Sequence, residues 1–497
     1  MILKTRFAAS ISVVSGLFMA QMIATVQVYI SNLAFHDKMS WLAQTGYLTV
    51  PNQKILPTLN MMAPAFYGGV FFTLSIGIGI SLISLVCVWT WKYVCHLKRG
   101  FLPGFVGLWA VSIIALNWHG FVLMPTLHAI FIPAVVVTLF LLLSPKDMGK
   151  RTRMALLLHF LTFSLLVILW STQMSSTLYV NIRDNLLLSN TPGIRFNDLY
   201  YQYTLYPAEV FRNLNQKLIK TYHLLETSDS QEHKRLIRKL NNYDYLPIGE
   251  NGKSDVQIEV QKNRIRLWGN RQTAIEMELD NFYKNTRKSL GDLSKKNDAY
   301  IHFRAATSIS LLVGFPLVLY WVFNGLLVQC FSLFLGKRPA VIAGVAACFL
   351  IGVLLLLLMP MGHKKEITID RLPGMLASNN WKNRVAALQY VDANKIDLQQ
   401  FDLTRNLSQH PSIPVRYWLA RSLGVGSHPG DEAHLITLTQ DPHPNVACQA
   451  LYSIGKRKFR KVTARLLETI RDSDHWYVQL YTYNSLRKLG WKQSTSN

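Results

Sequence analysis

The chain has 497 residues, of which 50% are hydrophobic and only 16% are charged. Soluble domains carry about 25% charged residues, so this composition excludes an ordinary soluble protein and indicates that much of the chain is embedded in lipid. The formal net charge of +24 is typical of membrane proteins with basic cytoplasmic loops. Nucleic acid is therefore not expected as a partner. The five cysteines include no CxxC motif, so neither zinc nor cysteine redox chemistry is expected.

Seven apolar stretches are each long enough to cross a bilayer, which needs about 20 apolar residues. They are residues 7–30, 66–91, 103–121, 125–144, 154–173, 306–332 and 339–361. The first is too long for the apolar core of a secretory signal, so we expect it to be retained as a membrane helix. Within the second, "SIGIGIS" spaces small residues by four, which suits close helix packing inside the chain or with another subunit.

Basic residues in short loops predict the orientation. Lys4 and Arg6, the loops "WKYVCHLKRG" and "SPKDMGKRTR", and the turn before the last stretch all belong inside. The sequence thus predicts a multi-pass protein of the bacterial cytoplasmic (inner) membrane with a cytoplasmic N-terminus. Residues 174–305 and 362–497 would then be extracytoplasmic, on the periplasmic side. The basic "GHKKE" after the last stretch opposes this, and an error of one helix would move the C-terminal region to the cytoplasm.

The predicted domain order is a five-span membrane bundle, an extracytoplasmic α+β insertion, two further spans and a repeat domain, over residues 1–173, 174–305, 306–361 and 362–497. In the insertion, helical spacing is expected over residues 206–225, 229–243 and 271–290. Alternating apolar residues in "VQIEVQKNRIRLWG", with Lys262 and Asn263 between the two runs, predict a β-hairpin.

Two similar phrases stand near the end of the chain, "LSQHPSIPVRYWLARSLG" and "LTQDPHPNVACQALYSIG". Val415 and Val446 occupy the same place in them, and Val385 and Val478 mark degenerate copies on either side. Self-similarity at a period of about 30 residues indicates stacked repeats. In the third copy, the Asp and Pro residues of "DPHP" separate two helices, and Gly455 is expected to close the second as a left-handed cap.

This pattern, from a Leu through "QDPHPNV" to a final Ile-Gly, resembles HEAT-like repeats, including those of the phycobilisome-lyase type, over residues 370–490. The resemblance implies an α-solenoid that binds other proteins. The chain departs from the family pattern because an Arg follows the key Val only as Arg416, and because the fourth copy is rich in aromatic residues. Lyase members of the family act on chromophores bound to partner proteins, and nothing in this sequence supports that role.

The predicted fold is therefore mainly α: a polytopic helical membrane bundle of about seven spans, a small α+β insertion and a C-terminal HEAT-like α-solenoid. No catalytic constellation is present, so we expect a non-enzymatic scaffold, assembly factor or accessory subunit of an envelope complex. Membrane lipid and a partner protein are the expected partners, and no metal or cofactor is expected. The candidate partner-binding residues are Arg416, Trp418, Lys456, Arg457, Lys458, Arg460, Lys461 and Trp476.

Two alternatives stay open. His119 and His128 would flank one face of the membrane, and His96 and His159 the other, so that two pairs could ligate haem b in a redox subunit that binds haem or quinone. The third hypothesis is a transporter with a regulatory repeat domain. It is disfavoured because the apolar stretches contain almost no charged residues, which usually mark ion pathways.

Overall fold

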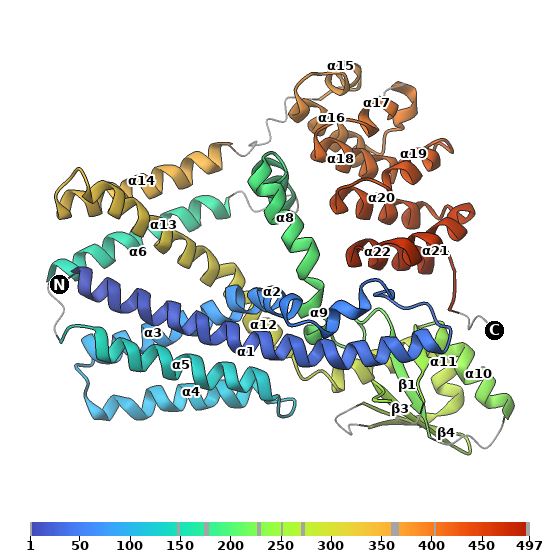
Figure 1. Cartoon of the computed structure of the whole chain (residues 1–497), viewed down its shortest axis with the longest axis horizontal. Helices are drawn as coiled ribbons and strands as arrows, with labels where there is room; N and C mark the ends of the chain where they lie inside the picture. Colours follow the sequence, from blue (N-terminus) through green and yellow to red (C-terminus); the bar gives the residue numbers. More distant parts are fainter. Residues whose placement is uncertain are drawn as a thin grey trace.

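The computed structural model describes residues 2–146, 150–172, 178–225, 230–249, 252–269, 274–358, 367–401 and 404–493. The chain is mainly helical, with one small sheet. Long apolar helices form a bundle, and the N-terminus lies at its left end in Figure 1. The unit that carries the sheet and the stack of short C-terminal helices both lie at the opposite end of this bundle.

Six segments of the described residues are long and apolar enough to cross a membrane, so the chain has the features of a membrane-embedded protein. They are Phe7–Gln44, Met62–Tyr93, Arg99–Leu116, Leu123–Leu143, Ile301–Ser332 and Arg338–Leu357. The predicted stretch 154–173 falls in helix α6 (Lys150–Ser171), whose described apolar part, Leu157–Ser171, is shorter than the other six.

A 3-10 turn, η3 (Arg99–Phe101), begins the third of these segments, and eight α-helices and two π-helical turns form the rest. They are α1 (Ile2–Gln44), α2 (Met62–Phe72), η2 (Thr73–Gly77), α3 (Ile78–Tyr93), α4 (Leu102–Leu116), α5 (Leu123–Leu143), α12 (Ile301–Ile309), η5 (Ser310–Gly314), α13 (Phe315–Ser332) and α14 (Lys337–Leu358). Helices α1, α3 and α5 pack together, and α13 packs on α14, which also contacts α6.

The two π-helical turns lie against each other and join the halves of the bundle. The Ser310 hydroxyl in η5 donates a hydrogen bond to the backbone carbonyl of Ser75 in η2. A Cβ atom at Gly79 would collide with Ser310, so glycine is needed for this approach. The small residues of "SIGIGIS" therefore serve helix packing within the chain.

Helix α1 is longer than a membrane requires. Its 43 residues extend over about 65 Å, roughly twice the thickness of a bilayer core. The predicted span 7–30 is thus only the first part of this helix. The remainder reaches the sheet, where Lys38 Nζ lies 2.6 Å from Asp255 Oδ1 and Trp41 packs on Gly249.

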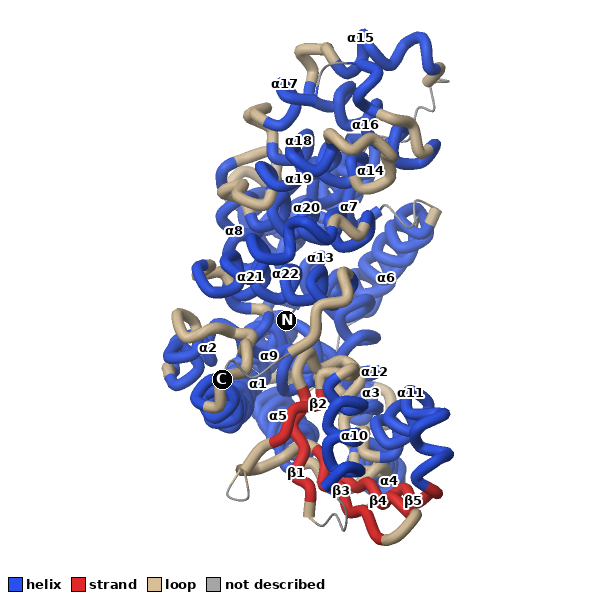
Figure 2. Tube along the Cα trace, turned by 90° about the vertical axis from the view of Figure 1, so that its right-hand side faces the viewer, coloured by secondary structure: helices blue, strands red, loops and turns tan. Residues whose placement is uncertain are grey.

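The insertion combines short helices with a five-stranded sheet of order β2-β1-β3-β4-β5. Strand β1 pairs in parallel with both β2 and β3, whereas β4 pairs antiparallel with both β3 and β5. Helices α10 and α11 pack on the sheet (Figure 2). The elements are α7 (Leu178–Ile182), η4 (Arg183–Leu187), α8 (Thr191–Tyr203), α9 (Leu205–Phe211), β1 (Lys220–Leu224), α10 (Ser230–Asn241), β2 (Tyr245–Pro247), β3 (Val256–Gln261), β4 (Arg264–Gly269), β5 (Ala274–Glu278) and α11 (Leu279–Lys296).

The predicted hairpin is confirmed, because β3 and β4 pair across Lys262 and Asn263. Lys262 has a φ of 53°, which a two-residue hairpin turn requires. Continuous helix over 206–225 is wrong: α9 ends at Phe211, and the later residues form β1, which is held between β2 and β3. Helix over 271–290 is wrong for its first part, which pairs with β4 as β5. Long-range pairing overrides the local helical spacing in both places.

The C-terminal region consists of short helices. The even-numbered helices from α16 onward pack on one another in order: α16 on α18, α18 on α20 and α20 on α22. Val385, Val415, Val446 and Val478 fall one on each of these four helices. The repeat period of the sequence is therefore the step from one of these helices to the next. The helices are α15 (Leu372–Leu376), α16 (Trp381–Asn394), α17 (Thr404–Ser408), α18 (Ile413–Leu423), α19 (Asp431–Leu438), α20 (Pro444–Arg457), α21 (Thr463–Asp472) and α22 (Trp476–Lys488).

The expected role of Gly455 as a left-handed cap is wrong. Helix α20 continues through Gly455 to Arg457, and Lys458 takes the left-handed conformation with a φ of 58°. Gly455 instead lies against α22, where an added Cβ would be 2.9 Å from the hydroxyl oxygen of Ser485. The glycine is needed because α20 and α22 approach each other closely at this point.

Candidate interaction site on the helical repeats

The C-terminal helices from α16 to α22 are here called the repeats. The segment that joins the bundle to the sheet, residues 178–204, lies along one side of them and is here called the connecting segment. Figure 1 shows α8 beside α18, α20 and α22. The Trp418 indole Nε1 donates to Asp184 Oδ2 at 2.9 Å. Further along, the amides of Asn197 and Asn445 exchange hydrogen bonds of 2.8 and 3.2 Å. The repeats thus bind a helical segment through side chains from successive copies.

The ion pair of Arg183 and Asp184 is buried at the first point of contact between the connecting segment and the repeats. Asp184 is only 2% exposed, and Arg183 binds its Oδ1 with Nη2 at 2.7 Å while stacking over the ring of Tyr417 at 3.8 Å. Burial raises the pKa of Asp184 above its ordinary value, although the charge of Arg183 opposes this. Removing one partner of a buried ion pair of this kind is strongly destabilising, because the other charge is left uncompensated.

Aromatic residues close the other end of the contact. The hydroxyls of Thr204 and Tyr477 lie 2.9 Å apart, and the rings of Tyr201 and Tyr477 have centroids 4.8 Å apart. Trp476 is 5% exposed and stacks on Phe35 of α1, with ring centroids 6.1 Å apart. The predicted binding residue Trp476 therefore joins the last repeat to the long first helix.

Arg416, also predicted to bind a partner, is buried and joins two repeat copies. Its Nε and Nη2 atoms bind the carboxylate of Asp441 at 2.6 and 3.0 Å. Its Nη1 atom donates to the backbone carbonyl of His410 at 2.6 Å. This bidentate geometry fixes the turn between α19 and α20 to α18.

The remaining predicted residues belong to residues 456–461, here called the basic turn, at the end of α20. Arg457 is held inside, with its Nη1 on Asp431 and its guanidinium 4.6 Å above the Phe459 ring. Its four basic neighbours are exposed: Lys456, Lys458, Arg460 and Lys461. The basic turn therefore presents four cations to solvent on a backbone that Arg457 anchors.

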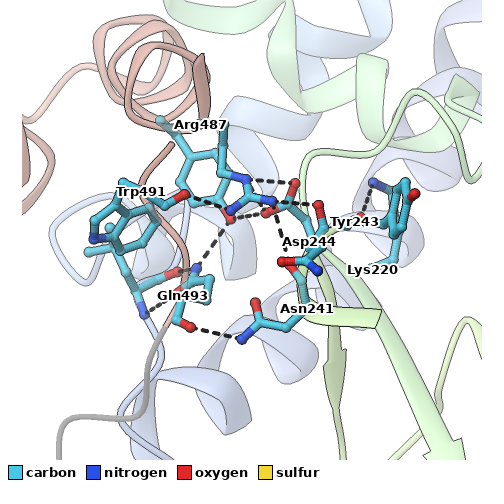
Figure 3. A network of polar contacts seen from close by, with 10 residues as sticks. Lys220, Asn241, Tyr243, Asp244, Arg487, Trp491 and Gln493 are labelled. Atoms are coloured by element: carbon cyan, nitrogen blue, oxygen red, sulfur yellow. Dashed lines mark hydrogen bonds and ion pairs between the residues drawn. The ribbon is translucent and has the colours of Figure 1, made fainter. Parts of the chain in front are cut away.

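One polar network that the sequence pattern does not reveal joins the repeats to the sheet unit (Figure 3). Asp244 accepts hydrogen bonds from Tyr483 Oη at 2.7 Å and from Arg487 Nε at 3.2 Å. Asn241 Nδ2 donates to the backbone carbonyl of Gln493 at 2.8 Å. These partners are separated by about 240 positions, so local periodicity contains no signal for them.

The loop after α1 forms a second such connection. The backbone N–H of Asn52 donates to Gln479 Oε1 at 2.9 Å. Its side-chain amide donates to the carbonyls of Ile470 and Ser473 at 2.7 and 3.0 Å. The last repeat is thus attached to the bundle as well as to the sheet unit.

The four haem candidates lie in different settings. His96 is exposed in the turn after α3, with a φ of 50°. The ring of His119 stacks on His302 with centroids 5.2 Å apart, and His159 Nδ1 lies 3.1 Å from the Tyr320 hydroxyl. The fourth, His128, is fully buried in α5.

The Nδ1 atom of His128 is 2.9 Å from the carbonyl of Met124. Within the described part of the chain, no three His, Cys, Asp or Glu residues are grouped so that they could hold a metal ion. Axial ligation of haem b by the histidines stays a prediction.

Comparison with known proteins gives no match: no protein-family model, no curated protein and no solved structure is similar to this chain.

Proposed function

We propose that this protein is an integral membrane scaffold or accessory subunit whose C-terminal repeats bind a partner protein at the membrane surface. The observation that carries the proposal is the contact between the repeats and the connecting segment. There, Trp418 and Asn445 bind Asp184 and Asn197 through defined hydrogen bonds. Stacked helical repeats of this kind present extended surfaces for binding proteins.

The proposal includes a HEAT-like α-solenoid for residues 370–490. Its support is the agreement between the repeat period and the spacing of α16, α18, α20 and α22. It also includes seven spans, with α6 as the fifth, in a bacterial cytoplasmic membrane. The sheet unit and the repeats lie at one end of the bundle and the N-terminus at the other (Figure 1). With Lys4 and Arg6 inside, both would be periplasmic.

The basic turn is the part of the repeats that we assign to the partner. Trp418, Arg416 and Trp476 are buried in contacts within the chain, whereas the four exposed cations of the basic turn are available to solvent. Their charge favours an acidic surface on the partner, because complementary charge accelerates association and discriminates between partners.

The test is co-purification of the detergent-solubilised full chain from its native membrane. Reversing the four exposed cations to Glu (Lys456, Lys458, Arg460 and Lys461) should remove a defined protein that the unaltered chain retains at stoichiometric amounts. Zero-length cross-linking of the unaltered complex should join the partner's carboxylates to the lysines of the basic turn.

The matched control reverses the same number of exposed cations on α11: Lys284, Arg287, Lys288 and Lys296. It changes the net charge equally, so it should keep the partner if the basic turn is the docking site. Retention of the partner by both variants, or a chain that purifies alone from its own membrane, contradicts the proposal.

A further inference from the structure

A cavity of about 520 Å³ lies between the bundle and the sheet unit. One side is a stripe of α1 that runs from Gln27 to Ala34, and another is the start of α5, residues 121–124. The sheet unit closes it with the loop after α9, the start of β3 and the junction between α11 and α12. The cavity therefore lies where the apolar bundle meets the polar domain.

The polar side of this cavity carries two cations, Arg212 and Lys217, and three carboxylates, of which Glu209 is bound through Oε1 by Arg212. Both oxygens of Asp255 are occupied: Oδ1 by Lys38 and Lys217 at 2.6 and 2.8 Å, and Oδ2 by Thr221. Asp298 accepts from Arg304, Asn213 and the backbone N–H of Tyr300. These carboxylates are thus committed to the chain.

The two cationic side chains that line the cavity have more N–H donors than their ion pairs within the described residues occupy. Among the described residues, Arg212 gives only its Nη1 group to Glu209, and Lys217 Nζ is bound by Asp255 alone. Arg has five N–H donors and Lys has three. Although burial opposes its charge, the attraction of Asp255 raises the pKa of Lys217 above its ordinary value. Both groups can therefore donate to an anion in the cavity.

Gln27 adds an independent indication of a ligand. Its side chain lines the cavity and is 3% exposed. Within the described part of the chain, neither its amide nitrogen nor its amide oxygen has a hydrogen-bond partner. Burying an amide without partners is costly, so a ligand that both accepts and donates a hydrogen bond fits this position.

The level of the cavity relative to a membrane indicates the source of the ligand. Gln27 follows the first apolar residue of the span, Phe7, by about 30 Å along α1, which is the thickness of a bilayer core. Three apolar residues at the rim are exposed: Ile30 by 53%, Phe121 by 70% and Leu123 by 53%. An acyl chain could lie along them while its headgroup occupies the polar side.

We propose that this cavity binds the headgroup of an anionic phospholipid from the leaflet next to the sheet unit. The phosphodiester accepts hydrogen bonds from Arg212 and Lys217. A headgroup hydroxyl, as in phosphatidylglycerol, donates to the Gln27 oxygen, and the Gln27 amide nitrogen donates to the headgroup. The bound lipid thereby connects α1 to the sheet unit. This inference does not depend on the protein partner proposed above.

The experiment is native mass spectrometry of the delipidated full chain in detergent, titrated with dioleoylphosphatidylglycerol or dioleoylphosphatidylcholine. One phosphatidylglycerol should be retained at least about tenfold more tightly than phosphatidylcholine, as expected for charge-assisted hydrogen bonds. Soluble sn-glycerol 3-phosphate tests the other source of the same chemistry, and it should not compete at equal concentration because it lacks the acyl chains.

Two variants change the cavity without leaving a buried charge that lacks its ion-pair partner. Gln27→Leu replaces the unpartnered amide by an apolar side chain of similar size. The double variant Glu209→Gln with Arg212→Gln removes both members of one ion pair. Each should weaken phosphatidylglycerol binding by about tenfold or more. Lys284→Gln, an exposed cation on α11, should bind as the unaltered chain does.

Loss of the lipid-dependent rise in Tm is the second readout. Delipidated Gln27→Leu should unfold at or above the temperature of the unaltered chain, which shows that it folds, and added phosphatidylglycerol should no longer raise its Tm. Equal binding of the two lipids, full competition by glycerol 3-phosphate or unchanged binding by both cavity variants would each overturn the proposal.

Discussion

The indole of Trp418 and the carboxylate of Asp184 form a buried hydrogen bond of 2.9 Å across 234 positions of the chain. Trp418 belongs to the repeats, and Asp184 belongs to the connecting segment that leaves the bundle. Arg183 neutralises the carboxylate from the other side at 2.7 Å. The contact fixes where the repeats stand relative to the bundle, because both side chains are buried and hydrogen-bonded to each other.

Trp418→Phe should therefore destabilise the repeats by about 1.5–3 kcal/mol, the usual contribution of a hydrogen bond to a charged group. The loss would combine the missing N–H donor with the packing lost when the buried indole is replaced by a smaller ring. Thermal unfolding of the detergent-solubilised chain measures the effect. Trp381→Phe, at the partly exposed start of α16, is the control, and an equal loss in both variants would contradict this role.

The Asn197–Asn445 pair makes a double-mutant prediction. Either single Leu substitution leaves a buried amide without its partner and should cost about 1–3 kcal/mol. The double Leu variant buries two apolar groups against each other and should recover most of this loss. Unfolding temperatures of the four chains give the coupling energy. Strictly additive losses would mean that the two amides do not bind each other.

Gly455→Ala should destabilise the stack by about 1–3 kcal/mol, because the added methyl group would force α20 away from Ser485 on α22. Gly374→Ala is matched to it, since Gly374 also lies in a helix but has no heavy atom near its Cβ position within the described residues. That variant should be neutral or stabilising, because Ala favours helix. Comparable unfolding temperatures for the two would refute the close approach of α20 and α22.

The buried triad of Asp255, Lys38 and Lys217 predicts a dependence on pH. Burial alone would raise the pKa of Asp255, but the charges of Lys217 and Lys38 outweigh it and hold that pKa well below its ordinary value. The folded state therefore binds this proton less readily than the unfolded state. The stabilising contribution is complete above a pH of about 4 and is lost as the pH falls further.

Asp255→Asn should accordingly lower stability near neutral pH by about 3–5 kcal/mol, as expected when one partner of a buried ion pair is removed. It should also flatten the decline of Tm below a pH of about 4. Glu276→Gln breaks the exposed pair with Arg264 and should cost less than about 1 kcal/mol. If the decline of Tm at low pH is the same in this variant as in the unaltered chain, Asp255 is not the group that causes the decline.

Reporter fusions test the proposed sidedness. A reporter enzyme that is active only outside the cytoplasm should be active both when inserted at residue 240 and when fused at residue 497. Parity requires this result if α6 crosses the membrane. Activity at residue 240 together with inactivity at residue 497 would show that one span has been counted wrongly.

Local periodicity was sufficient for several parts of this structure. The six long apolar segments and the β3–β4 hairpin are confirmed by the structure. Val385, Val415, Val446 and Val478 lie one each on α16, α18, α20 and α22. Apolar runs, alternation and a fixed repeat period are properties of neighbouring residues, so a single chain displays them without any knowledge of its fold.

The candidate sites were less accessible from the sequence. The sequence predicts that Arg416 and Trp418 bind a partner, but only the structure shows that their side chains are bonded to Asp441 and Asp184 within the chain. The exposed cations of the basic turn could be named from the sequence, whereas the anchoring role of Arg457 could not. The cavity near Gln27 has no local signature, because its walls come from six separate parts of the chain.

By itself, then, the sequence determined the apolar segments, the hairpin and the period of the repeats, since each depends on residues within a few turns of one another. Only the tertiary structure decided that Tyr222 lies in a strand, that Gly455 serves packing and that the repeats bind the connecting segment. Those outcomes depend on partners far apart in the chain, such as Asp244 and Arg487. Their energies exist only once folding has brought the groups together and excluded water.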